Sequence, residues 1–125
     1  MSYLNLHWFF PILRGMGLGL LAMAVHEAAH VVAALALGIE VKKIGMGWKG
    51  MYTVRHQSTP GKNMLVSLAG PLTNLALLVF WHWLPLFGLA NLCIGAVNLL
   101  PIEGSDGLRV MNCWQQMHKK DVPVL

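Results

Sequence analysis

An apolar run from Gly15 to Leu37 constrains the fold of this chain more than any other feature. Within the run only His26, Glu27 and His30 are strongly polar. As a helix it would be about 34 Å long, enough to cross a hydrocarbon core of about 30 Å. An ionisable side chain at the centre of such a helix costs roughly 3 kcal/mol or more. We therefore expect a membrane-spanning helix whose polar side chains have a function.

These polar residues form the pattern His26-Glu27-Ala28-Ala29-His30. Two histidines four residues apart lie on the same side of a helix and can hold one metal ion. The glutamate projects roughly 100° further round the helix, where it can accept a proton from a water molecule activated by zinc. This pattern is typical of a metallopeptidase. A buried polar cluster that only ties helices together is the alternative, which the cost of burying ionisable groups disfavours.

The composition predicts one membrane domain over residues 1–125. Of the 125 residues, 56% are hydrophobic and 11% are charged. Three apolar runs carry most of the hydrophobic excess, and we expect spans at about 15–37, 62–84 and 86–100. The first residues have no basic region and no small-residue cleavage site, so we expect no removable signal peptide.

The net charge of +4 is a signal of topology and does not indicate a nucleic-acid partner. With three spans, all nine basic residues except Arg14 fall on the same side of the membrane. Positive charge gathers on the cytoplasmic side, so we expect the Lys42–Lys62 loop and the C-terminal segment to face the cytoplasm. Cys93 and Cys113 belong to no paired motif, and we expect both to be reduced.

The segment between the first two spans is β-prone. Ile39–Met46 and Met51–His56 are expected to be strands, joined by a turn at Gly47–Gly50, so we predict a β-hairpin. A solvated loop is the alternative. An exposed edge of the hairpin, including Thr53, would be able to pair with an unwound substrate segment.

Local signals set the remaining boundaries. Residues 3–13 are aromatic-rich and predict an interfacial segment ahead of the first span. Gly38 is expected to end the helix of the first span as its C-cap. Asn74, in the second span, is expected to face inward because lipid exposure is costly. The third run, Leu86–Leu100, is about 22 Å long as a helix, too short to span alone, and Pro101 stops it.

A catalytic zinc ion usually has three protein ligands, so His26 and His30 need a partner. The candidates are Asp106, Glu103, His56, His82 and His118. We expect the three histidines to lie in polar or distant surroundings, which leaves the two carboxylates. Non-helical chain after Pro101 would carry Asp106 to the histidines, and the following glycine favours close approach there. The alternative role of Asp106 is to cap a helix expected at 108–118.

Three motifs resemble those of the site-2 protease family of intramembrane zinc metalloproteases. They are His26–His30, Gly70–Asn74, and Asn98–Gly107, which contains that family's Asn-x-x-Pro-x-x-x-x-Asp-Gly pattern. The resemblance implies one zinc ion per chain, bound by His26, His30 and Asp106, with Glu27 activating the water. It also implies that Asn98 and Asn74 position the substrate or its developing oxyanion.

The resemblance implies a mainly α, polytopic membrane fold: a minimal three-helix core with a β-hairpin after the first span and a broken third helix. Members of the family cut transmembrane segments of other proteins, commonly to release a transcription regulator or an anti-sigma factor. We therefore expect a zinc-dependent intramembrane endopeptidase of regulated proteolysis, in a prokaryotic cytoplasmic membrane with its active site toward the cytoplasm.

The expected partners are the bilayer and the transmembrane segment of a substrate. The chain shows no PDZ domain, nucleotide-binding domain or further span, so a homo-oligomer or an accessory subunit stays open. A catalytically silent membrane adaptor or metal-binding relic is the alternative function. A soluble-type zinc peptidase is disfavoured by the apolar spans and by the missing His-x-x-Gly-x-x-His extension.

Overall fold

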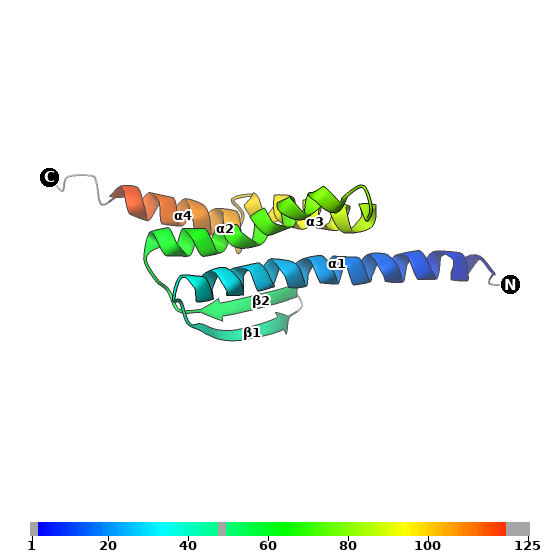
Figure 1. The fold of residues 1–125 in the computed structure, drawn as a ribbon, viewed down its shortest axis with the longest axis horizontal. Helices are drawn as coiled ribbons and strands as arrows, with labels where there is room; N and C mark the ends of the chain where they lie inside the picture. The colour runs from blue at the N-terminus through cyan, green and yellow to red at the C-terminus, as the bar shows by residue number, and fades with distance from the viewer. Residues whose placement is uncertain (1–2, 48–49, 120–125) are drawn as a thin grey trace.

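The computed structural model describes residues 3–47 and 50–119 and is mostly helical (Figure 1). The elements in chain order are α1 (Tyr3–Ala36), β1 (Val41–Gly47), β2 (Gly50–Arg55), α2 (Pro60–Ala76), the 3₁₀ helix η1 (Leu77–Phe80), α3 (Pro85–Leu99) and α4 (Asp106–Lys119). α1 lies between two layers, with the hairpin on one side and α2 and α3 on the other. The predicted helical fold with one small hairpin is confirmed.

The helix α1 is longer than predicted at its N-terminal end. It begins at Tyr3 and continues through Pro11, so residues 3–13 belong to the same helix as the expected span, whose start at about residue 15 stays a prediction. A proline removes one backbone donor, in this case the N–H that would pair with the carbonyl of His7, and the remaining hydrogen bonds hold the helix on either side. His7–Ala36 is long and apolar enough to cross a membrane.

The C-terminal end of α1 is the predicted glycine cap. Gly38 has a φ of 75°, the left-handed conformation that glycine adopts easily. The N–H of Ile39 donates to the carbonyl of Ala34 at 2.8 Å, and the N–H of Gly38 to that of Leu35 at 3.1 Å, which is the Schellman pattern. Ile39 then packs against Ala34 and Val66 in the small apolar core. This cap turns the chain so that the hairpin runs back along α1 (Figure 1).

The hairpin is antiparallel, with Ile44 opposite Thr53 and Gly47 opposite Gly50. The register shifts between Val41 and Lys43, which marks a bulge. Trp48 and Lys49, at the centre of the predicted turn, lie outside the described residues. β2 lies next to α1 and β1 lies on the far side (Figure 1), so the side chains of β2 can reach the metal-binding motif.

The second and third apolar runs differ from the prediction in length. Thr59 caps α2 by accepting a hydrogen bond from the N–H of Lys62 at 3.4 Å. α2 and η1 together end at Phe80, so the predicted end of the span at residue 84 is wrong, and residues 81–83 form a turn. Pro60–Phe80 is the second helical segment long enough to span, whereas α3 is shorter. A core of three spans is therefore not confirmed.

The break between α3 and α4 is held by Ser105. Its Oγ donates to the carbonyl of Leu100 at 2.6 Å and accepts from the N–H groups of Ile102 at 3.2 Å and Leu108 at 3.1 Å. Ser105 thus caps α4, and Asp106 is the first helical residue, not its N-cap. A Cβ on Gly107 would clash with the carbonyl of Leu99, so α4 starts tightly against the end of α3.

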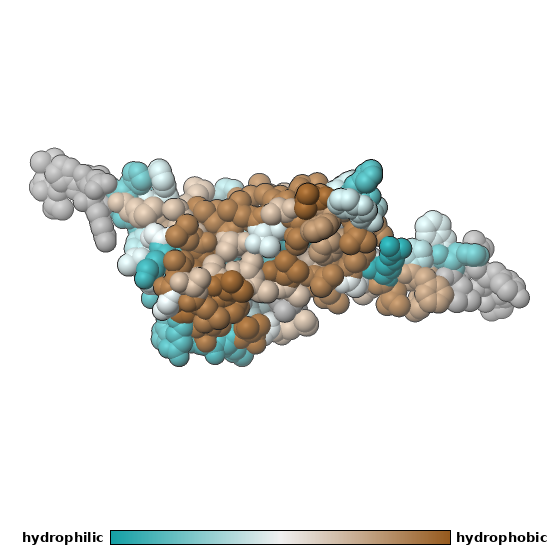
Figure 2. All heavy atoms as spheres, viewed as in Figure 1, coloured by the Kyte–Doolittle hydropathy of each residue, from teal (hydrophilic) through white to brown (hydrophobic). Residues whose placement is uncertain are grey.

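Polar side chains are as numerous as apolar ones at the buried positions of the described residues. The buried polar side chains are His26, His30, Ser67, Asn74, Asn91, Ser105 and Asp106, and the buried apolar ones are Ala22, Ala34, Ile39, Val66, Pro71, Phe87 and Cys113. Large apolar side chains instead point outward along α1, α2 and α3. Figure 2 shows them covering the middle of one face, with hydrophilic residues at the hairpin and toward the ends of the helices. A buried set this rich in polar groups, beneath large exposed apolar side chains, is unusual for a soluble protein and is expected where lipid covers the surface.

Candidate active site

Three potential metal ligands meet inside the helical layers. His26 and His30 lie one turn apart on α1, with 5% and 3% of their surfaces exposed, and Asp106 begins α4. Oδ2 of Asp106 is 2.9 Å from Nε2 of His26 and 3.1 Å from Nε2 of His30. The two Nε2 atoms are 3.0 Å apart. The broken third helix thus brings its carboxylate to the histidine pair, as the spacing predicts.

Each imidazole is held by its other nitrogen. Nδ1–H of His30 donates to the carbonyl of Val66 at 2.7 Å, and Nδ1–H of His26 donates to Oδ1 of Asn74 at 2.6 Å. These contacts fix the tautomers, because a neutral imidazole that donates from Nδ1 has a lone pair on Nε2. Such outer partners of metal-binding histidines are the usual way to orient a ligand.

The donor set fits a divalent metal ion. With both Nδ1 atoms as donors, three lone-pair atoms face one another at 2.9 to 3.1 Å, and a cation between them would remove their repulsion. Zinc ligands at about 2.0–2.2 Å in tetrahedral geometry lie roughly 3.3–3.6 Å apart, so the three atoms need to separate only slightly. Two histidines and one carboxylate are a common ligand set of catalytic zinc.

A carboxylate binds a metal ion in its ionised form, so Asp106 would complete the ligand set as the deprotonated group.

The glycine of the Gly70–Asn74 motif makes room for the histidines. A Cβ at Gly70 would clash with the ring of His30 and lie 2.8 Å from Cε1 of His26. Only the absence of a side chain lets α2 pass this close to both rings. Pro71 and Asn74, which come after Gly70 on α2, are also buried.

Glu27 lies beside the histidines and is held by the hairpin. One ligand atom from each of His26, Glu27 and His30 falls within 4.8 Å of the others, so this group can hold a metal ion. Oγ1 of Thr53, on β2, donates to Oε2 of Glu27 at 2.8 Å. From the sequence, Thr53 was expected only at an exposed strand edge. Its contact with Glu27 was not predicted, because it forms only when β2 lies next to α1.

The two asparagines expected to contact substrate lie in different settings. Asn74 is fully buried, as expected, and its Nδ2 donates to the carbonyl of Ala22 at 3.2 Å and to Oδ1 of Asn91 at 2.8 Å. Asn98 is partly buried and lines the same cavity as the metal ligands, with its Nδ2 donating to the carbonyl of Ile94 at 2.8 Å. Asn98 can therefore face a substrate, whereas the Asn74 amide is occupied by protein groups.

The sequence reasoning missed Asn91. It is fully buried in α3, accepts from Asn74 and donates from Nδ2 to the carbonyl of Phe87 at 2.8 Å. A polar chain therefore runs from α3 through α2 to His26. The signal that could have found Asn91 is an amide inside an apolar run, where such a group is costly unless it is paired.

The remaining ligand candidates lie away from the histidine pair. Glu103 is exposed in the turn before α4, and His82 is exposed in the turn after η1. Nε2 of His56 lies 3.3 Å from Oε2 of Glu40. The ring of His118 packs on that of Trp114, with ring centroids 4.1 Å apart.

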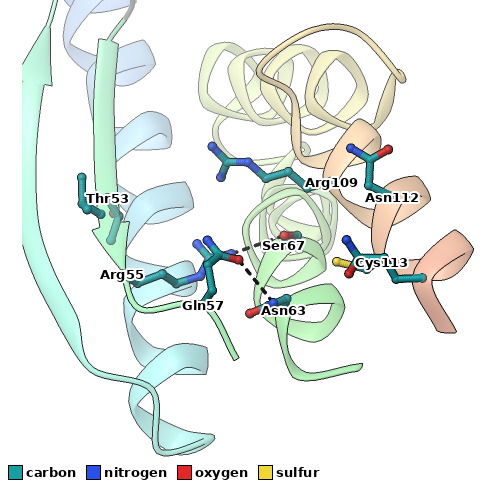
Figure 3. Close-up of a pocket in the computed structure, with 10 residues that line it drawn as sticks. Thr53, Arg55, Gln57, Asn63, Ser67, Arg109, Asn112 and Cys113 are labelled. Carbon is teal, nitrogen blue, oxygen red and sulfur yellow. Dashed lines mark hydrogen bonds between the residues drawn. The ribbon is translucent and has the colours of Figure 1, made fainter. Parts of the chain in front are cut away.

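The described residues form a cavity at the site and two further cavities beside it. His26, Glu27, His30 and Asp106 line a central cavity of about 260 Å³. A larger polar cavity of about 360 Å³ lies between β2, α2 and α4 (Figure 3). An apolar groove of about 250 Å³ borders Glu27 between α1 and β1, lined by Ala24, Ala28, Val31, Val32 and Ile44.

Curated proteins similar to this chain carry the name of zinc metalloproteases. A "Putative zinc metalloprotease" of Synechocystis is 32% identical over 126 residues, covering 84% of this chain and 33% of that protein. Another, of Methanocaldococcus jannaschii, is 36% identical over 75 residues, covering 49% of this chain and 39% of that protein. The "Putative zinc metalloprotease Rip2" of Mycolicibacterium smegmatis is 33% identical over 94 residues, covering 58% and 36%.

The chain spans about a third of the length of these relatives. No family model matches it. The relatives nevertheless agree with the residues that meet in the fold, since each is named for the metal and the activity that the motifs indicate. They support the predicted resemblance, because over part of its length this chain is similar to proteins named putative zinc metalloproteases.

Proposed function

We propose that this chain is a zinc-dependent intramembrane endopeptidase that hydrolyses peptide bonds in transmembrane segments of other membrane proteins, in regulated proteolysis. The observation that carries the proposal is the convergence of three lone-pair atoms, with a glutamate beside them, in a cavity enclosed by apolar helices. One zinc ion per chain would be held by His26, His30 and Asp106. When bound, zinc supplies a Lewis acid that lowers the pKa of water to about 7 and polarises a carbonyl.

The other polar groups have separate roles in the proposed reaction. Glu27 takes a proton from the attacking water and delivers it to the leaving amine. Thr53 holds the carboxylate of Glu27 in place through their 2.8 Å hydrogen bond. Asn98, which lines the cavity, donates to the developing oxyanion. Asn74 acts as a positioning residue for His26, because its amide is occupied by His26, Ala22 and Asn91.

Exposure of the long helices supports a membrane location. A core helix of a soluble protein is mostly buried, but only 22% of the most apolar stretch of His7–Ala36 is buried, and 28% of that of Pro60–Phe80. Lipid is the solvent that would cover these apolar surfaces at least cost. We place the active site toward the cytoplasmic face of a prokaryotic membrane, in accordance with the basic residues of the hairpin loop.

The apolar groove beside Glu27 offers a path for the substrate. Small side chains at Ala24 and Ala28 leave α1 open to another helix, and Glu27 borders the groove. A transmembrane helix hides its carbonyls in its own hydrogen bonds, so it must unwind before hydrolysis. We expect the unwound segment to pass between α1 and the hairpin and to reach the central cavity in extended form.

The proposal is tested by co-expression with a panel of tagged membrane proteins that each contain one transmembrane segment. Wild type should release a fragment from at least one of them, and Glu27→Gln should abolish release while retaining zinc. Glu40→Gln is the matched control, because it makes the same change on an exposed side chain that contacts His56. Fragments that persist in Glu27→Gln would contradict the assigned base.

A catalytically silent membrane adaptor is the second candidate. The convergence of His26, His30 and Asp106 and the hydrogen bond that holds Glu27 disfavour it, because a protein without activity has no need to keep costly ionisable groups in this arrangement. Zinc bound at full occupancy without any Glu27-dependent fragment would favour the adaptor.

A further inference from the structure

A polar cavity beside the candidate active site carries positive charge (Figure 3). Arg55 extends into it from β2, and Arg109 from α4. None of the described residues that line it is acidic. Amides and hydroxyls form much of the remaining wall: Gln57, Asn63, Ser67, Asn112 and Gln116.

Within the described residues Arg55 has no acidic partner, and Arg109 has only a distant one. Nη2 of Arg55 donates a long hydrogen bond of 3.4 Å to Oγ of Ser67. Nε of Arg55 is buried and has no hydrogen-bond partner among the described residues. Nη1 of Arg109 lies 3.8 Å from Oδ1 of Asp106, too far for a hydrogen bond. Burial and the nearby charge of Arg109 both lower the pKa of Arg55. Two like charges facing one cavity, with an unpaired buried donor, are the surroundings that bind an anion.

This cavity adjoins the central one. Thr53, Arg55 and Arg109 line both cavities, so no separate wall divides the arginines from the metal ligands. Glu27, in the central cavity, also borders the apolar groove. A peptide that crosses the site therefore meets apolar walls at one end of its path and guanidinium groups at the other.

We propose that Arg55 and Arg109 form a specificity subsite for a carboxylate of the substrate, supplied by an aspartate or glutamate in the polar segment that flanks its apolar part. A guanidinium binds a carboxylate through two parallel hydrogen bonds, and the amides of Asn112 and Gln116 can occupy its remaining lone pairs. The inference rests on the proposed function and names its substrate class: a transmembrane segment followed closely by an acidic residue.

Binding is the measurement that tests this subsite independently of hydrolysis. The probe is a pair of fluorescent peptides in detergent, each with about 20 apolar residues followed by a short polar tail. The tails differ only in carrying two aspartates or two asparagines. The protein is the full chain with Glu27→Gln, loaded with zinc. We expect the aspartate peptide to bind about tenfold more tightly, as for one added charge-assisted hydrogen bond.

Charge variants assign the preference to the two arginines. Arg55→Gln and Arg109→Gln should each bring the two peptides to nearly equal affinity, and Arg109→Glu should favour a peptide with a lysine tail. Lys42→Gln removes the same charge from an exposed position of β1 and should leave the preference intact. Zinc content is measured in parallel, because Arg109 lies next to Asp106.

Equal affinity of the two peptides for the unmutated subsite would overturn the inference, as would a preference that survives both arginine variants. Competition by inorganic phosphate or a short-chain anionic lipid without any peptide preference would assign the arginines to a headgroup and also overturn it. Failure of the proposed function has a different signature, since absent hydrolysis by wild type leaves these binding constants unaffected.

Discussion

At the scale of single residues, the site is organised by what holds each ligand. His26 and His30 have one nitrogen bound to a protein acceptor and the other facing Asp106. The histidine pair follows from the sequence, since two histidines four residues apart are a local pattern. The third candidate ligand, Asp106, was expected from the resemblance, because the residues alone left Glu103 open as well. The partners Val66, Asn74 and Asn91 come from other helices, and no local pattern in the sequence joins them.

The first residue-scale prediction concerns the metal itself. Wild type should contain about one zinc per chain, and His26→Ala or Asp106→Ala should lose most of it, because each change leaves only two strong ligands. Elemental analysis of the purified protein measures the content. Full zinc in Asp106→Ala would show that another group completes the site.

Asn74 carries the second residue-scale prediction. Asn74→Ala should weaken zinc binding about 10- to 100-fold, because the ring of His26 loses the acceptor that orients it. Asn91→Ala should have a smaller effect, since it removes only the outer bond of the chain. Competition with a chelator measures the affinity, and Thr73→Ala on the same helix is the control. An unchanged affinity in Asn74→Ala would refute the positioning role.

The third prediction concerns the contact between Thr53 and Glu27. Thr53→Val keeps the shape of the side chain but removes the donor, so cleavage should fall about tenfold while zinc content stays constant. Thr53→Ser keeps the hydroxyl and should retain most of the activity. If both variants cleave alike, the hydrogen bond has no role in the reaction.

The same contact changes how the strand edge can be tested. A proline at Thr53 would disturb Glu27 as well as the strand, so it no longer separates the two effects. Arg55 is excluded for a similar reason, because it belongs to the proposed carboxylate subsite. A proline scan over residues 51, 52 and 54 tests pairing with the substrate, because proline cannot donate to a ladder. Intact cleavage at each of those positions would leave the hairpin as a connector.

At the scale of elements, the apolar runs predicted where the helices lie, and glycines predicted where some of them end. Gly38 ends α1, and Gly107 lies against the end of α3. The sequence indicates both, because glycine adopts a positive φ easily and lets two backbone segments approach closely. The helical start of α1 was not predicted, because aromatic composition indicates an interfacial position and does not indicate whether the segment is helical. The cap of α4 could not be settled from spacing alone, because Ser105 and Asp106 are neighbours that both suit an N-cap.

Ser105 provides the element-scale prediction. Ser105→Ala should destabilise the start of α4 by about 1 kcal/mol, since it removes the cap of Leu108. Zinc affinity should fall with it, because Asp106 is the next residue. Thermal unfolding and chelator competition measure the two effects, and Ser105→Thr should restore both. Reduced stability with unchanged zinc affinity would show that the carboxylate is held independently of the cap.

At the scale of the whole molecule, many buried side chains are polar, whereas apolar residues cover the middle of the face shown in Figure 2. Composition predicts this surface, because 56% of the residues are hydrophobic. The adjoining cavities were not predictable, because Arg55 and Arg109 are 54 residues apart and meet only when β2 and α4 face α2. Sequence therefore predicts the apolar surface of this protein better than the internal cavities that we propose to bind its substrate.

The arrangement of the helices makes membrane orientation the last prediction. α2 runs antiparallel to α1 and α3 antiparallel to α2 (Figure 1), so the end of α1, the start of α2 and the end of α4 lie at one end of the molecule. Lys42, Lys62 and Lys119 belong to this end, and positive charge favours the cytoplasm. A reporter fused at Leu125 should read as cytoplasmic and one fused at Met1 as external. If α3 and α4 only re-enter the membrane instead of completing a third crossing, the reporter at Leu125 would read as external, and the active site would need a different route to the cytoplasm.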